Sequence, residues 1–386
     1  MKITHLFLPF LFIACIYISG CKKSEQPPAK EEYTGWEKVA PMHAPRDWAK
    51  SITTKDGKIL VLGGIANGQR VTTAELYDDA TKSWTSIGGL ECSGTEKLLL
   101  LKNGDIIATS ASSGTGSLFV SRLKPGARQF QNIGQIGTLI TGTSVNNFND
   151  LAELEDGTVV IAVFNKLMLL RPGTNSLELY SDPKEGYNRF QGATILPMGG
   201  TKFMTIQDGS AQGGFDGMLR AYDISQSYEY NATPFGDYKK IGYANISRYR
   251  LNDSTYLLLG GLPGNAAFIG IGAIGMVLEL NTGNVTYTDP NVVKPAFTGA
   301  SGIFKLANGN LYLVSEGGES GRQHKIYNPA AKAYVDESGY LRNGQNGVQL
   351  RAPEELNTNN ASSVAWLPGD DLFVVGKNVN YILRKK

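Results

Sequence analysis

The sequence predicts an all-β protein built from one repeated unit, and three observations support this. First, a tight turn followed by a short apolar strand occurs in seven copies, which begin at Asp56, Asn103, Asp156, Gly199, Asp253, Asn308 and Gly369. Second, several copies place an aromatic residue or leucine seven residues after the end of a strand, as in Tyr77 and Trp84. Third, 46 glycines and 16 prolines separate many short apolar runs, a composition that favours strands and turns over helices.

The best-preserved unit runs from Trp36 to Leu90. It contains a turn, an apolar strand and a diglycine (Asp56–Gly64), then a second strand (Thr73–Asp78), a turn and a closing strand that begins at Trp84. Asp-Gly and Asn-Gly are typical of two-residue hairpin turns, so we expect positive φ at both central positions of these turns. The apolar runs that follow suit strands buried on both faces.

The order turn-strand-Gly-Gly, then strand-Tyr-Asp-x-x-Thr-x-x-Trp, resembles the Kelch repeat over residues 36–90. Elsewhere the resemblance depends mainly on the spacing of the copies, which is close to the ~50 residues of a Kelch blade. It implies a seven-bladed Kelch-type β-propeller of the galactose-oxidase-like superfamily. That superfamily includes oxidases, a group of sialic-acid mutarotases and many pure binding modules, so the fold alone does not choose a function.

The two ends of the chain contain complementary parts of one blade. After Gly369 the chain has two strands, Asp371–Val375 and Asn380–Arg384, and then ends without a closing strand. Residues Trp36–Met42 instead resemble the closing strand Trp84–Leu90, although no blade precedes them. We therefore predict that the N-terminal strand pairs with the C-terminal blade and closes the ring, which removes two open sheet edges.

The first 20 residues are predicted to be a processing signal. Lys2 precedes an apolar segment, Leu6–Ile18, that is short for a membrane span. The sequence Ile18-Ser19-Gly20-Cys21 resembles the lipobox of bacterial lipoproteins, which implies cleavage before Cys21 and acylation of that cysteine. An ordinary secretory signal is the alternative.

Three segments follow from this interpretation. Residues 1–20 are the lipoprotein signal peptide, residues 21–33 a disordered tether from lipidated Cys21, and residues 34–386 a single propeller domain. The expected location is the bacterial cell envelope, anchored by lipid to the outer membrane, with either face possible.

A ligand site is expected on the rim of the ring where loops lead into each innermost strand, because seven such loops converge there. These loops are rich in amides, guanidinium groups and aromatic rings, which suit a polyhydroxylated ligand. The same residue types also brace loops and neighbouring blades. The candidate ligand-binding residues are Arg46, Asp47, Trp48, Glu96, Asn149, Asp150, Asn188, Arg189, Asn245 and Arg248.

Several chemistries have little support in the sequence. After removal of the signal peptide, His43, His324 and Cys92 are too few and too scattered to indicate a metal centre, a copper oxidase site or a disulfide framework. No nucleophile motif is present, and no cofactor or metal is expected. A formal charge of +2 without a long basic run argues against a nucleic-acid partner.

Two functions remain. The first is a non-enzymatic, monomeric binding module for a glycan or an envelope protein, with membrane contact through the lipid anchor alone. The alternative is a sugar mutarotase or epimerase, with Glu96 or Asp150 as the acid/base and Arg46, Arg189 or Arg248 as a carboxylate clamp.

Overall fold

The computed structural model of the 386-residue chain contains strands and turns. The residues it describes are 33–92, 95–111, 117–137, 149–163, 166–181, 194–208, 217–226, 229–234, 244–262, 276–287, 301–315, 323–335, 363–376 and 378–385. In this part of the chain no helix has the length and apolar character needed to cross a bilayer. The predicted signal peptide, Cys21 and the tether up to residue 32 lie outside the described residues.

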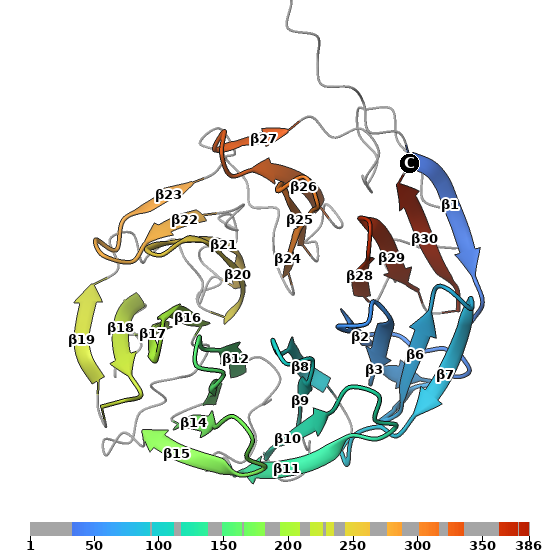
Figure 1. Cartoon of the computed structure of the whole chain (residues 1–386), viewed down its shortest axis with the longest axis horizontal. Helices are drawn as coiled ribbons and strands as arrows, with labels where there is room; N and C mark the ends of the chain where they lie inside the picture. The colour runs from blue at the N-terminus through green and yellow to red at the C-terminus, as the bar shows by residue number, and fades with distance from the viewer. Residues whose placement is uncertain are drawn as a thin grey trace, which may run out of the picture.

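Seven four-stranded antiparallel sheets form a ring and are numbered here as blades 1–7 (Figure 1). Blade 1 has β2 (Lys50–Thr53), β3 (Ile59–Leu62), β6 (Ala74–Asp78) and β7 (Ser83–Ile87). Blade 2 has β8 (Thr95–Leu100), β9 (Ile106–Ala111), β10 (Leu118–Leu123) and β11 (Gln131–Ile136). Blade 3 has β12 (Asn149–Glu153), β13 (Val159–Val163), β14 (Lys166–Leu170) and β15 (Leu177–Ser181). A small separate hairpin consists of β4 (Ile65–Ala66) and β5 (Gln69–Arg70).

The remaining four blades repeat the same plan. Blade 4 has β16 (Thr194–Gly199), β17 (Lys202–Asp208), β18 (Gly217–Asp223) and β19 (Glu229–Pro234). Blade 5 has β20 (Ala244–Asn252), β21 (Thr255–Leu262), β22 (Met276–Glu279) and β23 (Val285–Tyr287). Blade 6 has β24 (Ser301–Lys305), β25 (Leu311–Ser315), β26 (Gln323–Asn328) and β27 (Ala333–Val335). Blade 7 has β28 (Ser363–Leu367), β29 (Asp371–Val375), β30 (Asn380–Lys385) and β1 (Tyr33–Val39).

The predicted seven-bladed ring and its closure are confirmed. In blade 7 the strand order is β28-β29-β30-β1, so the first strand of the chain is the outermost strand of the last blade. The two strands are antiparallel and pair from Tyr33 opposite Lys385 to Val39 opposite Asn380, with one irregularity near Gly35. Figure 1 shows the blue and dark red ends of the chain side by side on the outside of this blade.

All seven blades have the same orientation in the ring. The chain enters every innermost strand at one rim, called here the loop rim. The hairpin turns between the first and second and between the third and fourth strands lie at the opposite rim, called here the turn rim. Because β1 ends at Val39 and leads into blade 1 at the loop rim, Tyr33 and its partner Lys385 lie at the turn rim.

The turns at the turn rim differ from the prediction in one respect. Positive φ occurs at the glycine of the first three Asp-Gly or Asn-Gly turns (Gly57, Gly104 and Gly157, 82°, 97° and 85°) but not at the residue before it. In blade 1 the amide of Gly57 donates to the carbonyl oxygen of Thr54. These are therefore type I turns followed by a left-handed glycine, the usual geometry of three-residue hairpin loops, and the expected two-residue turns are wrong here.

The core lies between the blades as well as inside them. The second strands of blades 1, 2 and 3 (β3, β9 and β13) are buried at every position. Apolar clusters join neighbouring blades, and the cluster between blades 2 and 3 contains Ile107, Val120, Leu151 and Ile161. The ring is thus stabilised by faces of adjacent sheets that exclude water from one another.

The seven-residue spacing seen in the sequence reflects cross-strand pairing. Tyr77 lies opposite Trp84, Leu170 opposite Leu177 and Tyr327 opposite Tyr334 in the outer two strands of blades 1, 3 and 6. In blade 5, Tyr287 instead lies opposite Met276. The spacing therefore reflects the length of the turn in these three blades, and in blade 5 the residues that pair at the same spacing are Leu278 and Val285.

The contact between blades 7 and 1 contains a network of ion pairs centred on one arginine. Arg384 of β30 binds Glu37 of β1, Asp371 of β29 and Asp79 in the β6–β7 turn of blade 1, at 2.6, 2.8 and 2.7 Å. The hydrogen bonds that Arg384 donates to Asp79 are the main cause that raises the pKa of Arg384, and burial opposes this change. Burial favours a higher pKa for Asp79, but Arg384 and Lys82 outweigh it and lower that pKa to about 2. One guanidinium therefore holds the closing strand, its own blade and the next blade together.

Candidate functional site

The loop rim of blade 1 is formed by residues 40–49 and the β4–β5 hairpin. The amide of Asp47 donates to the carbonyl oxygen of Ile65 at 2.8 Å, and the amide of Ile65 donates to the carbonyl oxygen of Asp47 at 2.7 Å. A Cβ at Gly64 would lie 2.4 Å from the carbonyl oxygen of Asp47, and its φ is 96°. The second glycine of the Kelch-like diglycine is therefore required for the loop to reach the hairpin.

Arg46 lies beneath this rim. Its side chain is fully buried and donates to the carbonyl oxygens of Ala44 and Thr73 at 2.9 and 2.7 Å and to Oε1 of Glu75 at 2.7 Å. Burial lowers the pKa of Arg46, while Glu75 opposes that change. Every guanidinium nitrogen is thus engaged within the protein, so Arg46 braces the loop against β6 and does not face a ligand.

His43 completes this brace. Its amide and its Nδ1 both contact Oε2 of Glu75 at 2.8 Å, and the amide of Ala44 contacts Oε1. The carboxylate of Glu75 is almost completely buried, so four groups from the loop satisfy it. A buried acceptor satisfied in this way fixes the conformation of the whole loop.

Trp48 projects from the braced loop. It is 70% exposed, the highest value among the large apolar side chains of the described residues that face solvent. Its φ is 59°, a left-handed conformation that is rare and costly for a bulky residue. The fully buried Ala49 follows it. The loop therefore holds an indole ring in water, at the cost of backbone strain, between two fixed neighbours.

The β4–β5 hairpin beside Trp48 was not predicted from the sequence. Asn67 and Gly68 form its turn with φ of 52° and 76°, which is the two-residue turn with positive φ at both central positions. Arg70 is exposed on its second strand. The signal that could have found this hairpin is the dipeptide Asn-Gly itself, because two-residue strands are too short to show a hydrophobic period.

Asp150 and Arg248 lie in the innermost strands β12 and β20, not in loops as predicted. They form an ion pair, and Arg248 also donates to the carbonyl oxygen of Leu151. Asp150 accepts a second hydrogen bond from the amide of Ile195 in β16, at 2.8 Å. The pair therefore links blades 3, 4 and 5, and each charge is largely satisfied by the other.

The structure brings together one predicted acid and one predicted clamp, Asp150 and Arg248, but the side chains of five other candidates have no described environment. Glu96, Asn149 and Asn245 belong to the innermost strands β8, β12 and β20, and their side chains lie outside the described part of the chain. Asn188 and Arg189 lie outside the described residues altogether. Among the described residues there is no group of three or more His, Cys, Asp or Glu side chains that could hold a metal ion.

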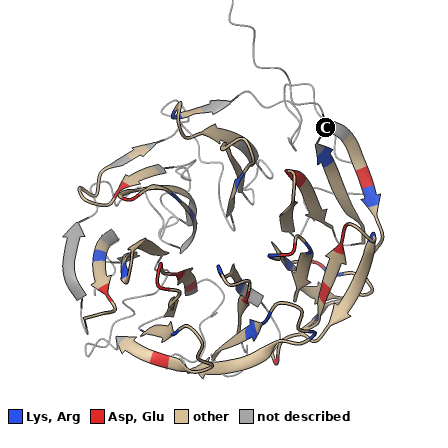
Figure 2. Cartoon of the chain, in the orientation of Figure 1, with Lys and Arg blue, Asp and Glu red and all other residues tan. Residues whose placement is uncertain are grey.

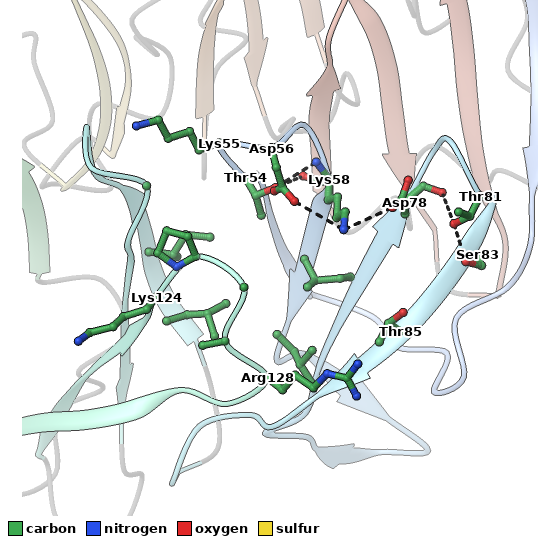
Figure 3. Close-up of a pocket in the computed structure, with 18 residues that line it drawn as sticks. Thr54, Lys55, Asp56, Lys58, Asp78, Thr81, Ser83, Thr85, Lys124 and Arg128 are labelled. Carbon is green, nitrogen blue, oxygen red and sulfur yellow. Dashed lines mark hydrogen bonds and ion pairs between the residues drawn. The ribbon is translucent and has the colours of Figure 1, made fainter.

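A second hollow lies at the turn rim, between blades 1 and 2 (Figure 3). It is a groove of about 680 Å³ lined by 18 residues from the turns and outer strands of both blades. Lys58 lies between Asp56 and Asp78, at 3.5 and 3.4 Å. Hydroxyl groups of Thr81 and Ser83 hydrogen bond to each other beside them, at 2.8 Å.

The other side of this groove is cationic. Lys124 and Arg128 come from the β10–β11 turn, and Lys55 comes from the β2–β3 turn. Figure 2 shows that charges of both signs are spread around the ring, so the predominance of cations at this edge is a local feature. The groove could not be predicted from the sequence, because turns from two neighbouring copies of the repeat form it.

Comparisons with known proteins agree with this architecture. The family model of the Kelch motif matches residues 50–91. No curated protein sequence matches the chain significantly. Among solved structures, a fungal alcohol oxidase of the AA5 family in complex with copper superposes with a TM-score of 0.59 at 12% identity, covering 92% of this chain and 76% of that one.

Two further structures are similar over nearly their whole length. The WD40 β-propeller domain of Doa1 has a TM-score of 0.55 at 12% identity and covers 92% of this chain and 98% of that chain. Streptogramin B lyase has a TM-score of 0.54 at 11% identity, covering 91% and 97%. At such low identity these likenesses show the fold and carry no function.

Proposed function

We propose that the protein is a non-enzymatic binding protein of the bacterial cell envelope. Its fold, a seven-bladed β-propeller with a Kelch motif in the first blade, is compatible with a binding module. The protein is anchored by acylated Cys21 and binds a glycan through the loop rim of blade 1. An envelope protein bound at the same rim is the competing outcome of the test below.

The observation that carries this proposal is the exposed and strained Trp48. A protein gains nothing in stability by holding a 70% exposed indole at a φ of 59°. The surrounding contacts, from Glu75 to the Asp47–Ile65 bridge, fix the loop before any ligand arrives. Such a preorganised site loses little conformational entropy on binding.

The chemistry around Trp48 favours a sugar. An indole face packs against the C–H groups of a pyranose ring, and the exposed Arg70 and the amide of Asn67 on the neighbouring hairpin can meet hydroxyl groups. A tryptophan of this kind also serves as the anchor of protein interfaces. The array and pull-down below distinguish the two.

The position of the chain start supports the orientation of this module. Tyr33 lies at the turn rim, so a tether of residues 21–33 would join the propeller on the side opposite Trp48. A lipid at Cys21 would then leave the loop rim directed away from the membrane. Several acyl chains, each contributing about 0.8 kcal/mol per buried CH₂, would make that attachment lasting.

The experiment is a glycan array on the full-length Cys21→Ser protein, followed by titration of the best glycan into Trp48→Ala. We expect the variant to bind about tenfold more weakly or worse, since about 1.4 kcal/mol of ring contact is lost. Leu179→Ala is the matched control, because Leu179 is also exposed (48%) but lies on the outer strand of blade 3. Equal affinity of the wild type and Trp48→Ala would overturn the proposed site.

Two further readouts address the other outcomes. If no glycan binds but an envelope protein is retained by the wild type and lost by Trp48→Ala, the ligand is a protein. An NMR assay of anomer interconversion tests the isomerase; turnover that disappears in Asp150→Asn would contradict a non-enzymatic role. The anchor has its own test, since Cys21→Ser should move the protein from the membrane fraction to the aqueous fraction.

A further inference from the structure

The groove at the turn rim between blades 1 and 2 has the chemistry of a binding site that is separate from the loop rim. Its floor is apolar, formed by the buried side chains of Ile87, Ile106 and Leu123. One wall carries the hydroxyl groups of Thr81, Ser83 and Thr85. Its volume of about 680 Å³ is within the ordinary range of small-molecule sites.

The cations of the groove differ in how far they are already satisfied. Lys58 is neutralised by Asp56 and Asp78, and the ammonium of Lys55 donates to the carbonyl oxygen of Lys102 at 3.0 Å. Within the described part of the chain, by contrast, no hydrogen bond or ion pair engages the side chain of Lys124 or Arg128. These two side chains are exposed and available to an anion.

The arrangement of the side chains indicates how an anion would sit. Figure 3 shows the guanidinium of Arg128 directed toward Thr85, below the wall that carries Ser83 and Asp78. Lys55 and Lys124 extend on the other side of the groove. A guanidinium beside hydroxyl groups can donate to the oxygens of a phosphate while the hydroxyls exchange hydrogen bonds with a polyol.

We infer that this groove binds a phosphorylated saccharide, with the phosphate at Arg128 and the sugar hydroxyls along the wall of Thr85 and Ser83. The proposal is independent of the ligand at the loop rim. Two sources of the same chemistry are possible, a free sugar phosphate and the headgroup of a phosphorylated glycolipid. The groove lies at the turn rim, as does Tyr33, where the tether joins the propeller. A headgroup in the anchoring membrane would therefore lie on the same side of the ring as the groove.

The test uses the protein without residues 1–21, which lacks both the acylated cysteine and the apolar segment Leu6–Ile18 and keeps every strand of the ring. Glucose phosphate and glucose are titrated by calorimetry; binding of the phosphate ester alone is the expected result. Arg128→Gln should weaken that binding about tenfold or more, as expected for loss of a charge-assisted hydrogen bond, and Thr85→Val should weaken it less. Lys332→Gln is the matched control, since Lys332 is an exposed cation in a blade 6 turn at the same rim.

Flotation with phosphatidylcholine vesicles, with and without phosphatidylinositol, identifies the source. Arg128-dependent flotation with phosphatidylinositol indicates a lipid headgroup, and calorimetric binding without flotation indicates a free sugar phosphate. The proposal is wrong if neither probe binds, or if Arg128→Gln and Lys332→Gln behave alike. Thermal unfolding of each variant ensures that a lost signal is not lost folding, and a failure here leaves the Trp48 test unaffected.

Discussion

The contact between blades 7 and 1 and the contact between blades 2 and 3 occupy equivalent places in the ring but are built differently. Between blades 2 and 3 the buried cluster is aliphatic throughout, with residues such as Ile107 and Ile161. Between blades 7 and 1 the cluster contains Tyr77, Trp84 and Phe373, with ring centroids 5.0 to 6.0 Å apart. The contact between blades 7 and 1 therefore depends on the relative orientation of aromatic rings as well as on the burial of apolar surface.

Polar contacts cross both boundaries. Between blades 2 and 3 the amide of Lys102 donates to Glu153 and the guanidinium of Arg122 donates to Asn175, at 2.9 and 2.7 Å.

Between blades 7 and 1 the polar contacts include one guanidinium that pairs with three carboxylates. The hydroxyl groups of Ser51 and Ser363 hydrogen bond at 2.6 Å, and Thr53 donates to the carbonyl oxygen of Trp366 at 2.5 Å. Arg384 forms ion pairs with the carboxylates of Glu37, Asp79 and Asp371. Blade 7 is the one blade assembled from both ends of the chain, so nothing covalent sets the register of β1 on β30. The ion pair between Arg384 of β30 and Glu37 of β1 is a directed contact that favours this register, whereas aliphatic packing is tolerant of small shifts.

Deleting β1, residues 33–39, should have the largest effect. The deletion removes the partner of β30 and uncovers a long sheet edge, so we expect a loss of at least about 5 kcal/mol, enough to abolish cooperative unfolding. Thermal unfolding followed by circular dichroism is the measurement. An unchanged transition would mean that the ring does not depend on its closure.

Truncating the aromatic cluster should cost more than truncating the aliphatic one. We expect Phe373→Ala to lower the free energy of unfolding by about 4 kcal/mol and Ile161→Ala by about 3 kcal/mol, because ring pairs add to the area buried. Both side chains are fully buried, so the comparison is matched for exposure. Denaturant unfolding at a common temperature gives both values. A larger loss for Ile161→Ala would contradict the distinction between the two contacts.

Replacing the central cation of the seam should have an intermediate effect that depends on pH. Arg384→Met should cost about 2 kcal/mol near neutral pH, since three carboxylates lose a partner. In the wild type the pKa of Asp79 is lowered from 3.8 to about 2, so its contribution is complete above the unfolded pKa and disappears as pH falls through the folded one. The wild type should therefore lose stability between those two values.

The variant should lose less over the same interval. Denaturant unfolding at a series of acidic pH values, at one ionic strength, measures both proteins. Parallel curves for the wild type and Arg384→Met would show that Arg384 does not control the ionisation of Asp79.

An exposed ion pair away from the seam should have the smallest effect. Arg171 and Glu178 pair across the outer strands of blade 3 at 3.1 Å, with side chains 35% and 53% exposed. Arg171→Met should change the free energy of unfolding by less than about 0.5 kcal/mol, and added salt should remove the effect. A loss equal to that of Arg384→Met would mean that bridging several strands gives no advantage.

The sequence predicted those features that depend on neighbours in the chain. Turn residues and apolar runs indicated seven copies, because each hairpin is specified within about 15 residues, near the usual size of such a unit. The closing role of β1 was also predictable, since Trp36 and Trp84 begin similar segments. The exact turn type was not, because Asp-Gly suits both a two-residue turn and a type I turn with a following glycine.

The candidate site was less predictable for the same physical reason. Arg46 and Trp48 are two residues apart and look alike as rim candidates, but one is buried against Glu75 and the other is exposed. Which of them faces solvent depends on the position of β6, which the local pattern does not contain. Arg128 was not predicted at all, because its groove exists only when blade 1 and blade 2 lie side by side.

The pairing of β1 with β30 also sets an order of events during synthesis. The first strand to leave the ribosome finds its partner only when Asn380–Lys385, at the far end of the chain, has been made. Until then six blades can form while the seventh is incomplete, with β1 at one end of an open arc and β28 and β29 at the other. A product truncated before Asn380–Lys385 would lack the partner strand of β1, so synthesis of that segment is a precondition for a closed ring.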